Sequence, residues 1–197
     1  MAREQSKSAK RRFNDGKFHS TYFVGHGIDI GAGPDPLSQY SHVFRGMTRV
    51  HSWDTPQGDA QYVKWINDNQ YDFVHSSHCL EHMVDPYVAL QNWIRITKPG
   101  GHLIITVPEE TLYEHGKWPS RFNGDHKWSF SIHKTRHSMP KAISIIEMLL
   151  TFDNIDVKRI ELVDDFFNPT EPADQTRTIT TECSIEIILQ KHVDKRA

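Results

Sequence analysis

The fold of this chain is decided by a short stretch near its start, Gly27-Ile28-Asp29-Ile30-Gly31-Ala32-Gly33-Pro34. The apolar residues of its first half predict a buried strand, and the two later glycines predict a tight turn directly after it. In open α/β sheets, ligands bind where the first strand meets the helix that follows it. Glycine suits that position because a side chain would hold the ligand away from the backbone. The stretch therefore predicts a ligand-binding turn on an α/β fold.

Strands and helices alternate along the rest of the chain. Further strands are expected at 49–54, 71–76, 102–107, 157–163 and 184–190, and helices at 86–96 and from Ser138 or Pro140 to Leu150. The run 102–107 is almost entirely apolar, which is typical of a strand buried on both faces of a parallel sheet. No clear helix separates the last two strands, which favours an antiparallel pair at one sheet edge. The pattern predicts a three-layer, Rossmann-like α/β sandwich, mostly parallel with an antiparallel final strand.

Length and charge limit the classes of protein to which the chain can belong. Its 197 residues match one domain, and 23 Lys and Arg against 25 Asp and Glu leave a net charge of -2. That balance argues against broad attraction to nucleic acid or to an anionic membrane. Two cysteines are too few for a disulfide framework, and no apolar run approaches the roughly 20 residues that cross a bilayer. We expect one cytoplasmic domain at 25–197, preceded by a basic arm at 1–24 that is solvated or, as the alternative, closes over a bound ligand.

The glycine turn departs from the dinucleotide pattern. Dinucleotide-binding folds use G-x-G-x-x-G, in which the third glycine lets the helix pack closely against a pyrophosphate. Here the third position is Pro36, and Asp29 precedes the first glycine by two residues. This combination disfavours a pyrophosphate and suits a ligand with an amino-acid moiety and a sulfonium. The turn resembles the first motif of the class I S-adenosylmethionine-dependent methyltransferases, which reads acid-x-G-x-G.

The resemblance extends over residues 25–108 and implies S-adenosylmethionine as the cofactor. Asp54 occupies the place of the family's ribose-binding acid, and Asp59-Ala60 resembles the motif that holds the adenine edge. Residues 71–82 are similar to the family's fourth strand and the following loop, which lines the methionine end of the cofactor. The cofactor-binding residues implied in this way are Asp29, Gly31, Ala32, Gly33, Pro34, Asp54, Asp59, Ala60, Ser76, Ser77 and His78.

One feature differs from the family's pattern. Asp54 and Asp59 lie close together in the sequence, whereas many members of the family place a helix and a strand between these positions. We therefore expect a shortened or missing third strand, and the division of roles between the two acids stays open.

Residues 109–137 form an irregular stretch that is predicted to be a lid over the acceptor. Between Tyr113 and Phe130 aromatic and charged residues are mixed without a helical or strand period. Long irregular segments in compact domains often carry function. A purely structural insertion is the alternative. Aromatic rings that stack and polar groups that bind hydroxyls suggest a small-molecule or saccharide-like acceptor, with no nucleic-acid or membrane partner.

Methyl transfer to a hydroxyl or an amine requires a base, and His78 and His126 are the candidates. His78, Glu81 and His82 also match the spacing H-x-x-E-H of one metalloprotease group. No third ligand motif is evident, and a metal-assisted reaction at Asp125 and His126 has no defined ligand set. We therefore expect no metal site. The competing functions are a cofactor-binding or partner-binding module without catalysis and a nicotinamide-dependent oxidoreductase.

Overall fold

The computed structural model describes residues 4–137 and 139–193. Its main sheet has six strands in the order β2-β1-β3-β4-β8-β7. Their bounds are β1 Gly25–Ile30, β2 Met47–Trp53, β3 Tyr71–Ser77, β4 Thr97–Pro108, β7 Ile155–Val163 and β8 Ser184–Lys191. Strands β2, β1, β3 and β4 pair in parallel, while β8 is antiparallel to both β4 and β7. The predicted sheet is confirmed, including the antiparallel pair at its edge.

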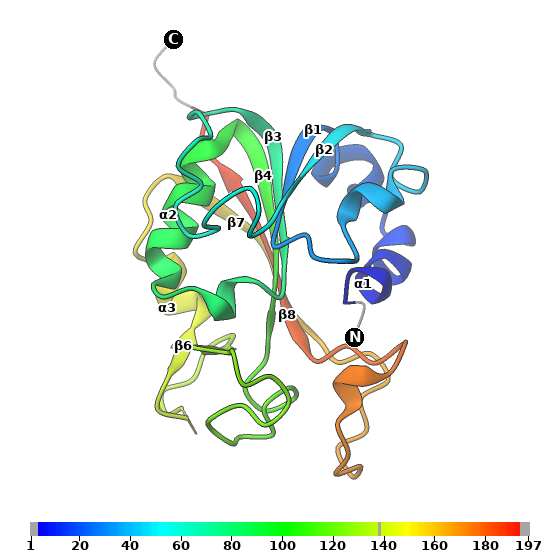
Figure 1. Ribbon diagram of the computed structural model, residues 1–197, viewed down its shortest axis with the longest axis vertical. Coiled ribbons are helices and arrows are strands. Elements are labelled where there is room, and N and C mark those ends of the chain that lie inside the picture. Colours follow the sequence, from blue (N-terminus) through cyan, green and yellow to red (C-terminus); the bar gives the residue numbers. More distant parts are fainter. Residues whose placement is uncertain (1–3, 138, 194–197) are drawn as a thin grey trace.

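Helices cover both faces of the sheet, which confirms the three-layer arrangement (Figure 1). Helices α2 (Pro86–Ile96) and α3 (Ile145–Leu149) lie on one face, and α1 (Glu4–Phe13) lies on the other. Four short helical turns accompany them: η1 Phe18–Tyr22, η2 Leu37–Tyr40, η3 Leu80–His82 and η4 Gln175–Arg177. One buried apolar cluster contains Trp93 and Ile105, and a second contains Phe18 and Phe73. Within residues 4–137 and 139–193 no helix has the length and apolar character needed to span a membrane.

Local signals in the sequence explain where α2 begins and ends. The Asp85 carboxylate accepts hydrogen bonds from the backbone amides of Tyr87 and Val88, and Pro86 takes the first helical position, where no amide proton is needed. The helix buries Trp93 completely. At its end, the Thr97 hydroxyl donates to the Trp93 carbonyl oxygen at 2.7 Å. The bounds predicted for this helix are confirmed.

The expected missing third strand is also confirmed. Residues 54–70 form turns instead of a strand, so β2 is the outer strand of the main sheet. Arg95 on α2 holds this segment in place, since its Nη1 donates to the Ile66 carbonyl at 2.8 Å and to the Asp68 carboxylate at 2.7 Å.

The helix predicted to start near Ser138 or Pro140 is wrong in its first half. Ala142–Ser144 is instead strand β6, which pairs in parallel with β5 (Ser129–Ser131) in a second small sheet. Helix α3 starts only after Ser144, whose hydroxyl accepts from the Glu147 amide at 3.5 Å. The apolar periodicity of 142–150 could not show that Ser129–Ser131 offers a pairing edge. Ser138 itself lies outside the described residues.

The prediction that the basic start is a solvated arm is also wrong. This segment contains α1, and the Arg12 side chain is completely buried although Lys10 is exposed. Arg12 donates to Glu186 on β8 at 2.7 Å and to the Thr106 hydroxyl on β4 at 2.9 Å. A buried carboxylate on a distant strand supplies the partner that lets a guanidinium enter the core.

Candidate active site

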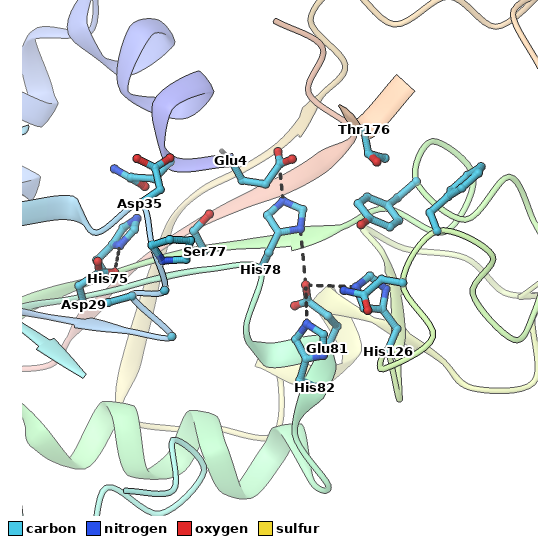
Figure 2. Close-up of a pocket in the computed structure, with 18 of the residues that line it drawn as sticks. Glu4, Asp29, Asp35, His75, Ser77, His78, Glu81, His82, His126 and Thr176 are labelled. Carbon is cyan, nitrogen blue, oxygen red and sulfur yellow. Dashed lines mark hydrogen bonds and ion pairs between the residues drawn. The ribbon is translucent and has the colours of Figure 1, made fainter. Parts of the chain in front are cut away.

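A cavity of about 750 Å³ opens where β1 and β3 end, as the position of the glycine turn predicts. Figure 2 shows Asp29 and His75 at one end of it and Glu81, His82 and His126 at the other, with His78 between them. Helix α1 contributes Glu4 to the lining. The volume lies within the range of small-molecule and cofactor sites.

The glycine turn is fixed to the end of β2. Gly31 and Gly33 have φ angles of 76° and 52°, in the left-handed region that glycine adopts without a steric penalty. The Gly31 amide donates to the Trp53 carbonyl at 2.9 Å, and the Gly33 amide donates to the Asp54 carboxylate at 3.0 Å. The turn therefore presents backbone, with no side chain from either glycine, to the cavity.

Replacing Gly31 with alanine is expected to destabilise the fold more than replacing Gly33. A Cβ at Gly31 would lie 2.6 Å from the Cβ and Sγ of Cys79, whereas the nearest atom to a Cβ at Gly33 is 3.9 Å away. Both variants place alanine at positive φ, which costs about 1–2 kcal/mol, and only Gly31→Ala adds an overpacking cost of about 1–3 kcal/mol. Urea unfolding of the two variants measures the difference, and equal losses would contradict the packing explanation.

Asp29, on β1, stabilises the glycine turn through hydrogen bonds of its side chain. Its carboxylate is 3% exposed and accepts the Leu37 amide at 2.7 Å, while its other oxygen lies 2.6 Å from Nδ1 of His75. Nε2 of His75 is 3.2 Å from the Arg12 guanidinium. Because a guanidinium only donates, Nε2 accepts and Nδ1 carries the proton given to Asp29. Through this chain of contacts α1 is connected to the glycine turn.

The structure gathers most of the predicted site residues around the cavity and leaves four outside its lining. Those that line it are Asp29, Gly31, Ala32, Gly33, Pro34, Ser77, His78 and His126. Asp54 is beside the cavity, where its carboxylate accepts the hydrogen bond from the Gly33 amide. Asp59 accepts the Gln61 amide at 2.7 Å, the Ala60 carbonyl accepts the Trp93 indole at 2.9 Å, and the buried Ser76 hydroxyl donates to the Ile30 carbonyl. Asp59, Ala60 and Ser76 therefore form hydrogen bonds within the protein and do not line the cavity.

At the end of the cavity that contains His82 and His126, the histidine side chains lie around the carboxylate of Glu81. Its side chain is completely buried, and its Oε1 lies 3.5 Å from Nδ1 of His78, 3.9 Å from Nε2 of His82 and 3.8 Å from Nε2 of His126. Burial opposes ionisation of Glu81, but the adjacent histidines outweigh it and its pKa lies below the usual value. Burial likewise opposes protonation of His78, yet Glu81 and Glu4 raise its pKa. His78 and Glu81 therefore favour their charged forms together.

The predicted lid segment does reach the cavity. Tyr113, Phe122, Asn123 and His126 line it, and Nδ1 of His126 lies 2.6 Å from the buried Glu114 carboxylate. Trp128 has a structural role instead, because its indole donates to the Met83 carbonyl at 3.1 Å. Burial raises the pKa of the Tyr113 phenol, and the negative charge of Glu81 adds to this effect.

Reasoning from the sequence missed several lining residues. Glu4 comes from α1, and Thr176 and Arg177 come from the long connection between β7 and β8. Glu81 is part of the segment 71–82 that resembles the family and of the metalloprotease spacing, but the sequence does not assign it a role in the site. An acid among the six histidines from His75 to His126 was the available signal, but only the fold shows that it is buried and which of the histidines meet it.

Comparison with known proteins identifies the family of the chain. A family model described as a methyltransferase domain matches residues 16–149. The chain belongs to the methyltransferase domain family. The resemblance to class I S-adenosylmethionine-dependent methyltransferases is thereby confirmed, and with it S-adenosylmethionine as the cofactor of the family.

Individual methyltransferases are similar to the chain at low identity. A ubiquinone biosynthesis O-methyltransferase of Klebsiella pneumoniae is 26% identical over 144 residues, which cover 73% of this chain and 56% of that protein. The chain thus spans little more than half the length of this curated relative. An S-adenosylmethionine-dependent methyltransferase from Archaeoglobus fulgidus has a TM-score of 0.59 at 17% identity, covering 93% of this chain and 94% of that chain. One from Mesorhizobium loti has the same TM-score at 12% identity, covering 93% and 100%. These two structures share the fold.

Proposed function

We propose that this methyltransferase-family chain transfers a methyl group from S-adenosylmethionine to a hydroxyl oxygen of a small-molecule acceptor. The observation that carries the proposal is one cavity with a glycine turn at one end and a cluster of histidines at the other. The first end suits the cofactor and the second suits an acceptor that must lose a proton. An oxygen acceptor is favoured because the curated relatives are named O-methyltransferases.

Two features of the cavity support binding of the cofactor: exposed backbone at the glycine turn and acidic side chains in the lining. A Cβ at Gly33 would meet no atom closer than 3.9 Å, so backbone is open to a ligand at this point. Asp29, Asp35 and Glu4 in the lining give the cavity a negative character that suits a sulfonium and an ammonium group. Asp54, whose carboxylate accepts the Gly33 amide beside the cavity, is the residue proposed to accept the two ribose hydroxyls. When bound, the cofactor supplies an electrophilic methyl group.

The chain's own residues would orient the acceptor, exclude water and take up a proton. Tyr113 lies with its ring centroid 5.1 Å from that of His126 and 5.9 Å from that of His78, which gives an aromatic wall for a planar acceptor. His78 and His126 are the proposed proton acceptors. Because Glu81 and Glu4 raise the pKa of His78, this imidazole holds a proton more readily, and His126, oriented by Glu114, is the better placed proton acceptor.

Calorimetric titration with S-adenosylmethionine and with its demethylated product tests the cofactor half of the proposal. Asp54→Ala is expected to weaken both affinities about 10- to 100-fold, because charge-assisted hydrogen bonds to the ribose are lost. Asp153→Ala, an exposed acid far along the chain, is the matched control and should leave both affinities unchanged. An unchanged affinity in Asp54→Ala would remove this acid from the ribose site. Cofactor binding without turnover on a panel of phenols, polyols and sugars would favour the module without catalysis.

A further inference from the structure

We propose that Glu81, His82 and His126 bind a divalent transition-metal ion, and that Zn²⁺ is the ion their chemistry favours. One ligand atom from each of the three residues lies within 4.8 Å of the other two. The site is at the acceptor end of the cavity, so the role of the ion rests on the proposed function although its binding does not. This replaces the expectation of no metal site, because folding brings His126 to the pair that the sequence already placed together.

The first observation is a buried carboxylate without donors. Glu81 is 0% exposed, and neither of its carboxylate oxygens has a hydrogen-bond partner. The nearest nitrogen, Nδ1 of His78, is 3.5 Å away. An ionised group in such a place is costly unless a cation or donors compensate it, and the His78 imidazole compensates it without forming a hydrogen bond. The nitrogens of His78, His126 and His82 lie 3.5, 3.8 and 3.9 Å from the same oxygen, Oε1 of Glu81.

The second observation is the orientation of the two imidazoles. Nδ1 of His126 lies 2.6 Å from the Glu114 carboxylate, and Nδ1 of His82 lies 3.2 Å from the backbone oxygen of Asp125. Both partners only accept, so each Nδ1 carries a proton. In the neutral imidazoles the Nε2 lone pairs then face Glu81, at 3.8 and 3.9 Å. Metal-binding histidines usually donate their other nitrogen to a carboxylate or a carbonyl in this way.

The distances are close to those of a loaded site. Zinc ligands at about 2.1 Å in a tetrahedron lie about 3.4 Å from one another. The observed separations from Oε1 of Glu81 exceed this by about half an ångström, and the three ligand atoms lie within 4.8 Å of one another before any side-chain adjustment. The backbone is already fixed, since the Lys127 amide donates to the Glu81 carbonyl at 2.9 Å and the Lys127 ammonium donates to the His82 carbonyl at 2.6 Å. The two segments that supply the ligands are therefore held together without an ion.

The donor set selects the class of ion. Two imidazole nitrogens and one carboxylate suit Zn²⁺ and other first-row transition ions, whereas Mg²⁺ and Ca²⁺ prefer oxygen ligands. Three protein ligands leave a coordination position for a small molecule, and the ligands line the cavity. A bound ion would act there as a Lewis acid that lowers the pKa of an acceptor hydroxyl, so His126 would be a ligand in the metal-loaded chain and the proposed proton acceptor only in the metal-free chain.

The experiment is direct measurement of metal binding by the full chain. After treatment with a chelator, the wild-type protein is expected to bind about one Zn²⁺ per chain in calorimetry, and Co²⁺ in its place should give visible d–d absorption. Glu81→Gln and His82→Asn should each weaken Zn²⁺ binding by about 10-fold or more, and Glu114→Gln by about 10- to 100-fold. His42→Ala, an exposed histidine outside the cavity, is the matched control. Excess Mg²⁺ should not compete.

Two results would overturn the proposal. One is a wild-type chain that binds no Zn²⁺. The other is an affinity that Glu81→Gln and His82→Asn leave unchanged while circular dichroism shows both to be folded. His82 is partly exposed, so its variant keeps the test valid if Glu81→Gln does not fold. Titration with S-adenosylmethionine is independent of this measurement, so failure of the metal site and failure of the proposed function are distinguishable.

Discussion

Replacing Glu186 with glutamine is expected to lower the free energy of unfolding by about 3–5 kcal/mol. Glu186 is completely buried on β8 and accepts hydrogen bonds from Arg12 at 2.7 Å and from Arg11 at 3.0 and 3.1 Å. The Arg12 side chain is buried as well. A neutral amide would leave the guanidinium of Arg12 in the core without its anion, and a guanidinium cannot escape by losing its proton.

Urea unfolding at neutral pH, followed by circular dichroism, measures this loss. Glu161→Gln is the matched control, because Glu161 is the β7 residue paired with Glu186 in the sheet and its side chain is 47% exposed. An exposed ion pair contributes about 0–1 kcal/mol, so the control should be close to wild type. A loss below about 1 kcal/mol in Glu186→Gln would show that the ion-pair network is not needed for stability.

The same network is expected to make stability fall steeply in acid. Burial opposes ionisation of Glu186, but the charges of Arg12 and Arg11 lower its pKa from 4.5 to about 2. Because the folded-state pKa is depressed, the stabilisation is complete above the unfolded-state pKa and is lost as pH falls through the folded-state value. One pKa unit corresponds to 1.36 kcal/mol, so Glu186 accounts for about 3 kcal/mol over this window.

Unfolding free energies measured at intervals from neutral pH down to pH 2 test this expectation. The wild-type chain should lose stability mainly below about pH 4.5, and Glu186→Gln should lack that part of the decline. A variant with the same acid slope as the wild type would assign the slope to other carboxylates.

The positions of the strands along the chain and the glycine turn could be predicted from the sequence because they rest on local patterns. Apolar runs with period two, the glycines at 31 and 33 and the capped start of α2 act within a few residues of one another. The family motif adds the cofactor. The missing third strand could also be predicted, because too few residues separate Asp54 and Asp59 to build it.

Contacts between distant segments could not be predicted in this way. The pairing of β5 with β6, the burial of Arg12 against Glu186 and the meeting of His126 with Glu81 each join residues far apart in the sequence. Whether a charged side chain is solvated or buried depends on the partner that the fold brings to it, and no local pattern records that partner. The sequence by itself determined the α/β sheet, its ligand-binding turn and the methyltransferase family. Only the tertiary structure decided that the basic start is part of the core and that the histidines surround one buried acid, because both depend on long-range electrostatic contacts.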